Sequence, residues 1–264
     1  MSPFMSKLFS PLKIRSVTIR NRVALSPMCM YSCDACDGVA NDWHLVHLGS
    51  RASGGCGLVM AEATAVAPNG RISPQDLGLW NGEQAEALKP VTEFIKSQGS
   101  VPAVQLAHAG RKAGTYRPWS KVRGQVPVDD GGWDDQVAPS AVTFKEGMRT
   151  PAEMSVVQIH ELIEQFVQSS KLALEAGFEV VELHAAHGYL LHQFLSPISN
   201  QRQDEYGGSF EGRTRLMRDL VSAVRTVWPE ELPLFVRVSA TDWVEGGWSL
   251  EDTVALAQSL APLG

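Results

Sequence analysis

Five apolar runs alternate with five amphipathic segments along the 264-residue chain. The runs have the length of buried strands, whereas the segments between them repeat apolar residues at helical spacing. They lie at residues 23–27, 57–62, 101–108, 180–185 and 234–239. Strands that alternate with helices form parallel sheets with right-handed crossovers. The alternation therefore predicts an α/β fold.

The first run is not followed by a Gly-x-Gly-x-x-Gly motif, so a dinucleotide-binding Rossmann fold loses its main support. We expect instead a (β/α)8 TIM barrel, of which about the first five strand-helix units are present. A closed barrel needs eight strands, so we expect residues 1–264 to be one barrel domain that is incomplete at its C-terminus. Residues 115–151 are rich in Gly, Pro, Asp and Trp, and a connection this long predicts a lid or a subdomain insertion.

The composition argues against two classes of partner. The net charge of −6 provides no basic field, so we expect no direct binding to nucleic acid. The chain has no apolar run of about 18 residues and no signal-peptide pattern at its N-terminus, so we expect no membrane span and a cytoplasmic location. Four cysteines (Cys29, Cys33, Cys36 and Cys56) fit a reducing compartment better than a disulfide scaffold.

The fourth apolar run ends in a cluster of polar rings: His184, His187 and Tyr189. In folds built from strand-helix repeats, ligands bind at the carboxyl ends of the strands. Two hydrogen-bond donors beside a phenol can polarise a carbonyl group and deliver a proton. The alternative is a histidine pair satisfied by core hydrogen bonds, but three such groups within six positions favour a catalytic site.

Two further polar residues stand inside apolar runs. Arg237 cannot lose its charge, so it must meet an anionic ligand or form an internal ion pair with Glu62 or Glu182. Gln105 offers both a donor and an acceptor, so it can bind an amide-like ring edge or form a core hydrogen bond. Together they suggest a planar heterocyclic ligand.

The spacing Cys29-x3-Cys33-x2-Cys36 is the cluster-binding signature of radical S-adenosylmethionine enzymes, and it supports that class as an alternative function. A bare metal site made by Glu182, His184 and His187, or by His44 and His47, would need ligands that converge in space. We predict no metal site.

Seven segments of the sequence resemble the Old Yellow Enzyme family of FMN-dependent ene-reductases and NAD(P)H dehydrogenases. They follow the family order and lie at residues 20–22, 26–31, 43–47, 62–66, 105–111, 184–189 and 206–209. A cysteine after Pro-Met and a His-x-x-His-x-Tyr motif are similar to the branch of bacterial xenobiotic reductases and thermophilic-type relatives. Cys33 and Cys36 have no counterpart in the family pattern.

The resemblance implies FMN as the cofactor and NAD(P)H as the reductant. Pro27, Met28 and Ala63 would line the flavin. Gln105 would bond its pyrimidine edge, Arg237 would face its N1/O2 region, and Cys29 would tune its potential near N5. The FMN phosphate site, which the family builds after the seventh and eighth strands, has no counterpart here.

The resemblance also implies roles around the substrate. His184 and His187 would bind the substrate oxygen, Tyr189 would donate the proton, and Tyr31 would shape the pocket. The implied reaction reduces an activated alkene such as an enone by hydride transfer from flavin N5 and proton transfer from Tyr189. The partner is therefore a small-molecule substrate, and a homo-oligomer stays open. The alternatives are the radical enzyme and an inactive fragment that only binds.

Overall fold

A five-stranded parallel sheet forms the centre of the computed structural model, which describes residues 6–264. Its strand order is β3-β4-β5-β8-β9, and every neighbouring pair is parallel. The strands are β3 (Ala24–Leu25), β4 (Leu58–Ala65), β5 (Val101–Ala107), β8 (Val180–Ala185) and β9 (Leu234–Val238). Strand order follows chain order, which confirms the parallel α/β arrangement.

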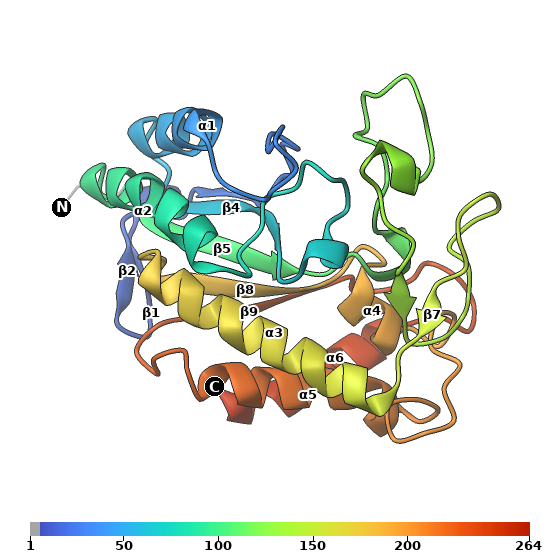
Figure 1. The fold of residues 1–264 in the computed structure, drawn as a ribbon. Coiled ribbons are helices and arrows are strands. Elements are labelled where there is room, and N and C mark those ends of the chain that lie inside the picture. Colours follow the sequence, from blue (N-terminus) through green and yellow to red (C-terminus); the bar gives the residue numbers. More distant parts are fainter. Residues whose placement is uncertain (1–5) are drawn as a thin grey trace.

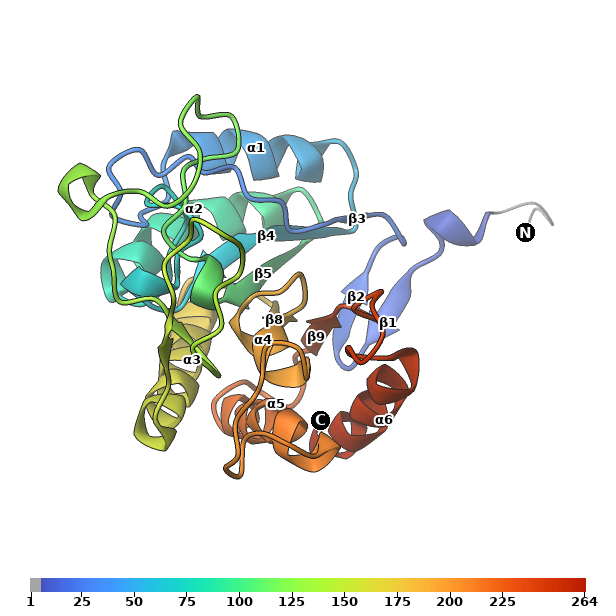
Figure 2. The same ribbon diagram turned by 90° about the vertical axis from the view of Figure 1, so that its right-hand side faces the viewer.

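The longer helices cover the convex side of the curved sheet (Figures 1 and 2). They are α1 (Asp42–Ser53), α2 (Gly82–Ser97), α3 (Val156–Glu175), α5 (Phe210–Arg225) and α6 (Leu250–Leu260). Helix α3 begins with a capping box: Gln158 N donates to Ser155 Oγ at 3.2 Å, and Ser155 N donates to Gln158 Oε1 at 2.9 Å. Such a cap stabilises a helix by about 1 kcal/mol.

Apolar faces of these helices meet the outer face of the sheet. Leu88 and Ile95 of α2, Phe166 of α3 and Leu220 of α5 are fully buried in one core. Fully burying a side chain of this size stabilises the fold by about 1.5–3 kcal/mol. Helix packing therefore fixes the strands, and the strand ends are rigid supports for side chains.

A small hairpin lies at the amino-terminal side of the sheet. Strands β1 (Leu12–Ile14) and β2 (Val17–Ile19) pair antiparallel. Val17 and Ile19 are buried in a second cluster with Leu58, Met60 and Val101. This cluster fills the end of the sheet opposite to the predicted site.

The predictions for the two edge strands were partly wrong. The first apolar run was expected to be a buried strand over residues 23–27, but β3 has two residues and Ala24 is exposed. Strand β9 is only partly buried along its whole length. Each pairs with one neighbour in the sheet, so neither is covered on both sides.

Strand β4 runs beyond its predicted end. It continues to Ala65 and all eight of its residues are buried, so Glu62 lies inside the strand. A register shift between Ala61 and Ala63 marks an irregularity at that carboxylate. One further helix, α4 (Leu190–Leu195), was not predicted.

Residues 115–151 contain little regular structure and project beyond the carboxyl ends of the strands (Figure 1). Strand β6 (Val137–Ala138) pairs with β7 (Ala152–Glu153), which follows this segment. The role of residues 115–151 as a lid or subdomain stays a prediction.

The 3-10 helices of residues 6–264 are η1 (Lys7–Phe9), η2 (Pro68–Gly70), η3 (Gly110–Lys112), η4 (Val128–Asp130) and η5 (Ala261–Leu263).

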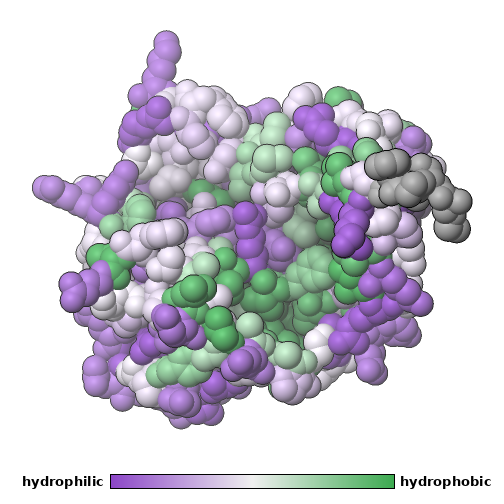
Figure 3. Space-filling model, turned by 180° about the vertical axis from the view of Figure 1, so that it is seen from behind, coloured by the Kyte–Doolittle hydropathy of each residue, from purple (hydrophilic) through white to green (hydrophobic). Residues whose placement is uncertain are grey.

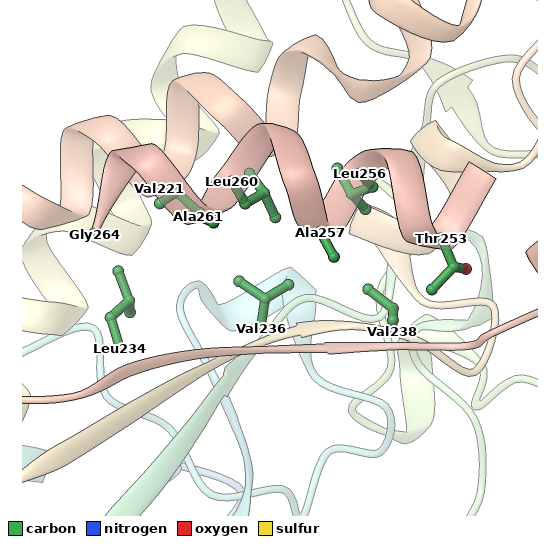
Figure 4. Close-up of a pocket in the computed structure, with 10 residues that line it drawn as sticks. All are labelled: Val221, Leu234, Val236, Val238, Thr253, Leu256, Ala257, Leu260, Ala261 and Gly264. Carbon is green, nitrogen blue, oxygen red and sulfur yellow. The ribbon is translucent and has the colours of Figure 1, made fainter. Parts of the chain in front are cut away.

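The side of the molecule opposite to the view of Figure 1 is hollowed and hydrophobic at its centre (Figure 3). An apolar cavity of about 240 Å³ lies between β9 and α6, with Val236 and Val238 facing Leu260 and Ala257 across it (Figure 4). None of the predicted site residues lines this cavity.

Within residues 6–264, no helix combines the length and the apolar character that crossing a membrane requires.

Candidate active site

The carboxyl-terminal parts of four parallel strands bring the predicted site residues side by side. Ala63 of β4 is the register partner of Gln105 of β5, and Gln105 is the partner of Glu182 of β8. His184 of β8 is in turn the partner of Arg237 of β9. Residues more than 170 positions apart in the sequence, such as Ala63 and Arg237, therefore share one rim of the sheet.

His184, His187 and Tyr189 form one cluster, as predicted. His184 Nε2 lies 3.3 Å from His187 Nδ1. The His184 ring is 5.0 Å from the His187 ring and 5.1 Å from the Tyr189 ring, both edge to face. His184 is buried and His187 is exposed, so the cluster opens to solvent on the His187 side.

The hydrogen bonds assign the protons of the two imidazoles. Ala186 N donates to His184 Nδ1 at 3.3 Å, so a neutral His184 carries its proton on Nε2. That proton points to His187 Nδ1, which then acts as the acceptor and leaves His187 Nε2–H free. A ligand receives one histidine N–H in this arrangement, and a second only if the bond between the histidines is replaced.

Burial, nearly complete for His184 and only partial for His187, keeps both imidazoles neutral. It lowers the pKa of His184 to about 3, with His187 and Arg237 adding to the effect. Burial and the charge of Arg237 also lower the pKa of His187. Neutral histidines remain ligands for a polar oxygen at pH 7, and neither adds a charge to the site.

The phenol and thiol groups near the cluster stay protonated. Burial raises the pKa of the Tyr189 phenol, and the negative charge of Cys29 or Asp76 would raise it further. Burial likewise raises the pKa values of Tyr31 and of the Cys29 thiol well above their ordinary ranges. Tyr189 therefore keeps a proton that it can give to a strong base formed beside it.

Lys112 is a further neighbour of the cluster and was not predicted from the sequence. Its Nζ lies 4.6 Å from the centre of the Tyr189 ring and donates to the carbonyl of His187 at 2.9 Å. It directly follows Arg111, the last residue of the segment 105–111 that resembles the family. A basic residue after the carboxyl end of β5 was the available signal.

Gln105 and Arg237 have different surroundings. Gln105 Nε2 donates to Glu182 Oε1 at 2.7 Å, which is the core hydrogen bond that the sequence left open. Arg237 is half-buried, and no carboxylate of residues 6–264 lies within 4.0 Å of its guanidinium, so the ion pair with Glu62 or Glu182 is absent from this part of the chain. Glu62 instead accepts the Met30 amide at 2.5 Å and lies 3.5 Å from His44 Nε2. A guanidinium in such a place suits an anionic ligand.

The sequence matches the profile of the NADH:flavin oxidoreductase / NADH oxidase family over residues 7–263. It is 47% identical over 257 residues to an NADPH dehydrogenase of a Geobacillus species, covering 97% of this chain and 70% of that protein. The chain belongs to this family. It is also 49% identical over 271 residues to an NADH:flavin oxidoreductase of Gibberella zeae; the match covers 98% of this chain but only 65% of that relative.

Solved structures agree with the family. The chain superposes on the Old Yellow Enzyme homologue from Zymomonas mobilis with a TM-score of 0.82 and 29% identity, covering 98% of this chain and 71% of that one. For morphinone reductase in complex with tetrahydroNAD the TM-score is 0.81 at 31% identity, with 98% and 71% covered. The predicted resemblance to the Old Yellow Enzyme family is confirmed. The fold class is the α/β barrel, seen here as a curved parallel sheet of five strands.

The donor set at the rim fits the FMN of this flavoprotein family. A guanidinium without a carboxylate of residues 6–264 within 4.0 Å suits the electron-rich pyrimidine edge of a flavin, the amide of Gln105 suits the same edge, and Ala63 adds only a methyl group beside it. Pro27 is half-buried and Met28 is half-exposed in the segment that follows β3, so both can cover an apolar ring.

The three closely spaced cysteines lie in different environments. Cys33 is buried with its Sγ 3.9 Å from His44 Nε2, whereas Cys36 is exposed and accepts a hydrogen bond from Gln75 at 3.4 Å. In the described part of the chain, no group of three or more His, Cys, Asp or Glu side chains is arranged to hold a metal ion. The radical-enzyme alternative gains no support from this geometry.

Proposed function

We propose that this chain contains the substrate-binding site of an FMN-dependent NAD(P)H oxidoreductase that reduces activated C=C bonds, as in enones. The observation that supports the proposal best is the cluster of two neutral histidines, His184 and His187, with a protonated Tyr189, next to the positive charge of Arg237. These groups suit a small substrate with a polar oxygen. The match to NADPH dehydrogenases over almost the whole chain supports the same class of reaction.

Five residues would hold the cofactor. Pro27, Met28 and Ala63 would contact the flavin ring, Gln105 would bond its pyrimidine edge, and Arg237 would face its N1/O2 region. When bound, FMN would supply the hydride that NAD(P)H provides. The positive charge of Arg237 would favour the negative charge of the reduced ring.

The protein side chains would bind and protonate the substrate. His187 Nε2–H would donate to the carbonyl oxygen, joined by His184 Nε2–H when the ligand oxygen replaces the bond between the two rings. This polarises the alkene and stabilises the enolate charge that develops on the oxygen. Tyr189 O–H would then donate its proton to the α-carbon, whose basicity exceeds that of a phenolate with this raised pKa.

Two residues of the segment after β3 would adjust the site. Cys29 would lie near flavin N5 and tune its potential as a neutral thiol. Tyr31 would shape the substrate pocket, and its ring lies edge to face against Trp119 of the projecting segment at 5.6 Å. That segment would therefore border the substrate, as expected of a lid.

Tyr189→Phe tests the proposal. Reoxidation of the reduced flavin by an enone should slow by roughly 10²–10⁴-fold, because only this half-reaction needs a proton on carbon. Reduction by NADPH should change little. Stopped-flow measurement of both half-reactions separates these effects. Tyr206→Phe is the matched control, since its buried phenol bonds to His160 at 3.2 Å, away from the cluster.

Equal slowing of both half-reactions in Tyr189→Phe would contradict the assignment. The visible absorbance spectrum of the purified chain distinguishes the alternatives: flavin bands support the proposal, a broad iron–sulfur band supports the radical enzyme, and no band supports a fragment that only binds.

A further inference from the structure

The turn that carries His187 and Tyr189 has an unfavourable backbone shape. Tyr189 N donates to the carbonyl of Ala186 at 3.2 Å, and the two residues between them have φ of +60° (His187) and +72° (Gly188). Positive φ at both central positions is typical of a type I′ turn, which residues other than Gly, Asn and Asp adopt reluctantly. Neighbouring groups must therefore help to hold this turn.

Both central amides of the turn donate to side chains from outside it. His187 N donates to Ser239 Oγ at 2.9 Å, and Gly188 N donates to His192 Nδ1 at 2.8 Å. Since Gly188 N–H is the donor, His192 Nδ1 carries no proton, and a neutral His192 has its proton on Nε2. His192 Nε2–H donates to Asp242 Oδ1, and the two heavy atoms are 2.9 Å apart.

Asp242 is itself firmly placed after β9. Its Oδ2 accepts the Ser196 hydroxyl at 2.6 Å and the Trp248 amide at 2.8 Å. Burial raises the pKa of Asp242, but the hydrogen bonds from His192, Ser196 and Trp248 outweigh burial and hold the pKa below its ordinary value. The group is therefore a fixed carboxylate, and it can select one tautomer of its histidine neighbour.

We propose that His192 and Asp242 act as a positioning pair, which fixes the turn at Gly188 and so places His187 and Tyr189 for ligand binding and proton transfer. The proposal rests on the proposed function of Tyr189. Both nitrogens of His192 are engaged within the protein, so it is not a catalytic residue. The loop after β9 thereby supports the site built on β8 through Ser239 and Asp242 together.

The competing role is a purely structural one. His192 is the third residue of α4, and the N-cap residue Tyr189 makes no side-chain cap bond. His192 could therefore serve only to start this short helix. In that case its loss would loosen α4 without changing the chemistry of Tyr189.

Three variants separate the two roles. His192→Phe removes the acceptor for Gly188 N. His192→Asn keeps an acceptor oxygen near the position of Nδ1 but loses the link to Asp242. Ser196→Ala is the matched control, because it removes one bond to the same carboxylate and leaves the pair intact.

Amide hydrogen exchange and imidazole ¹⁵N spectra measure the pair without any flavin. We expect exchange of the Gly188 amide to rise at least about tenfold in His192→Phe, to rise less in His192→Asn, and to stay near wild type in Ser196→Ala. The wild-type spectrum should show His192 protonated on Nε2, and Asp242→Ala should mix the two tautomers. Protonation of wild-type His192 on Nδ1 would overturn the proposal.

Stopped-flow kinetics of the flavin-loaded protein complete the test. Asp242→Ala should slow reoxidation by an enone roughly 10- to 10²-fold and leave reduction by NADPH nearly unchanged, as expected for a misplaced proton donor. Faster exchange along α4 with unchanged reoxidation would show that the pair only supports the helix. If Tyr189→Phe itself leaves reoxidation unchanged, the proposed function fails, whereas the exchange and tautomer results still decide the position of the turn.

Discussion

The buried imidazole of His184 should make the stability of the protein depend on pH in a window that can be calculated. Its pKa is about 3 in the folded protein and about 6.5 when exposed. Between these values the unfolded chain binds a proton that the folded protein does not, so the free energy of unfolding rises with pH. The free energy of unfolding is therefore highest above pH 6.5, where His184 is neutral in both states, and it decreases as the pH falls towards 3.

The magnitude follows from the same two values. At pH 5, which is about 1.5 units below the pKa of the exposed ring, proton binding to the unfolded chain lowers the free energy of unfolding. At roughly 1.4 kcal/mol per unit, the decrease is about 2 kcal/mol. His184→Asn removes the titrating ring but keeps an oxygen that can accept the Ala186 amide. The difference in the free energy of unfolding between wild type and variant should therefore shrink by about 2 kcal/mol from pH 8 to pH 5.

Urea unfolding followed by circular dichroism at constant ionic strength measures this difference at each pH. Ser199→Ala is the control, because it removes a buried hydroxyl bond to the Gln193 carbonyl (2.8 Å) and no titrating group. Its difference from wild type should be the same at pH 8 and pH 5. A constant difference for His184→Asn as well would refute the reasoning that this imidazole is held neutral by burial.

Three other outcomes are expected. Cys29→Ala should shift the flavin midpoint potential and change the rates of both half-reactions without abolishing them, as potentiometry and stopped flow would show; a mutant that instead loses iron would support the radical enzyme. Replacing His184 and His187 together by Ala should weaken phenol binding, each bond being worth about 0.5–1.5 kcal/mol, and unchanged affinity in a charge-transfer titration would argue against both as oxygen ligands. Gly207→Ala should lower the free energy of unfolding by about 1–3 kcal/mol in urea, because its Cβ would lie 2.4 Å from the Arg202 carbonyl oxygen, and an unchanged midpoint would contradict that clash.

The sequence predicts best the features that depend on neighbouring residues. The capping box of Ser155 and Gln158 and the cap at Asn41 could be recognised because cap chemistry lies within one helical turn. The gathering of His184, His187 and Tyr189 was predictable for a related reason. They lie within six positions, at the end of one strand and in the turn that follows it, so their closeness along the chain keeps them near one another.

Features that depend on distant residues could not be predicted. The partner of His192 is Asp242, 50 positions away, and the contact exists only because the loop after β9 lies against α4. Helix α4 gave no cap signal, since Tyr189 stands at its N-cap. The direction of the bond between His184 and His187 depends on a backbone amide, and a sequence pattern does not carry that information.

The projecting segment is attached to the loop that carries Cys29. Arg117 donates to Asp34 at 2.8 Å and to the Tyr31 carbonyl at 3.3 Å, and Trp119 packs against the Tyr31 ring. The ion pair between Arg117 and Asp34 is largely exposed and is worth about 0–1 kcal/mol. Under the proposed lid role, opening of the segment would break these contacts, which lie next to the backbone that carries Cys29. Substrate entry would then be coupled to the position of the thiol that is proposed to tune the flavin.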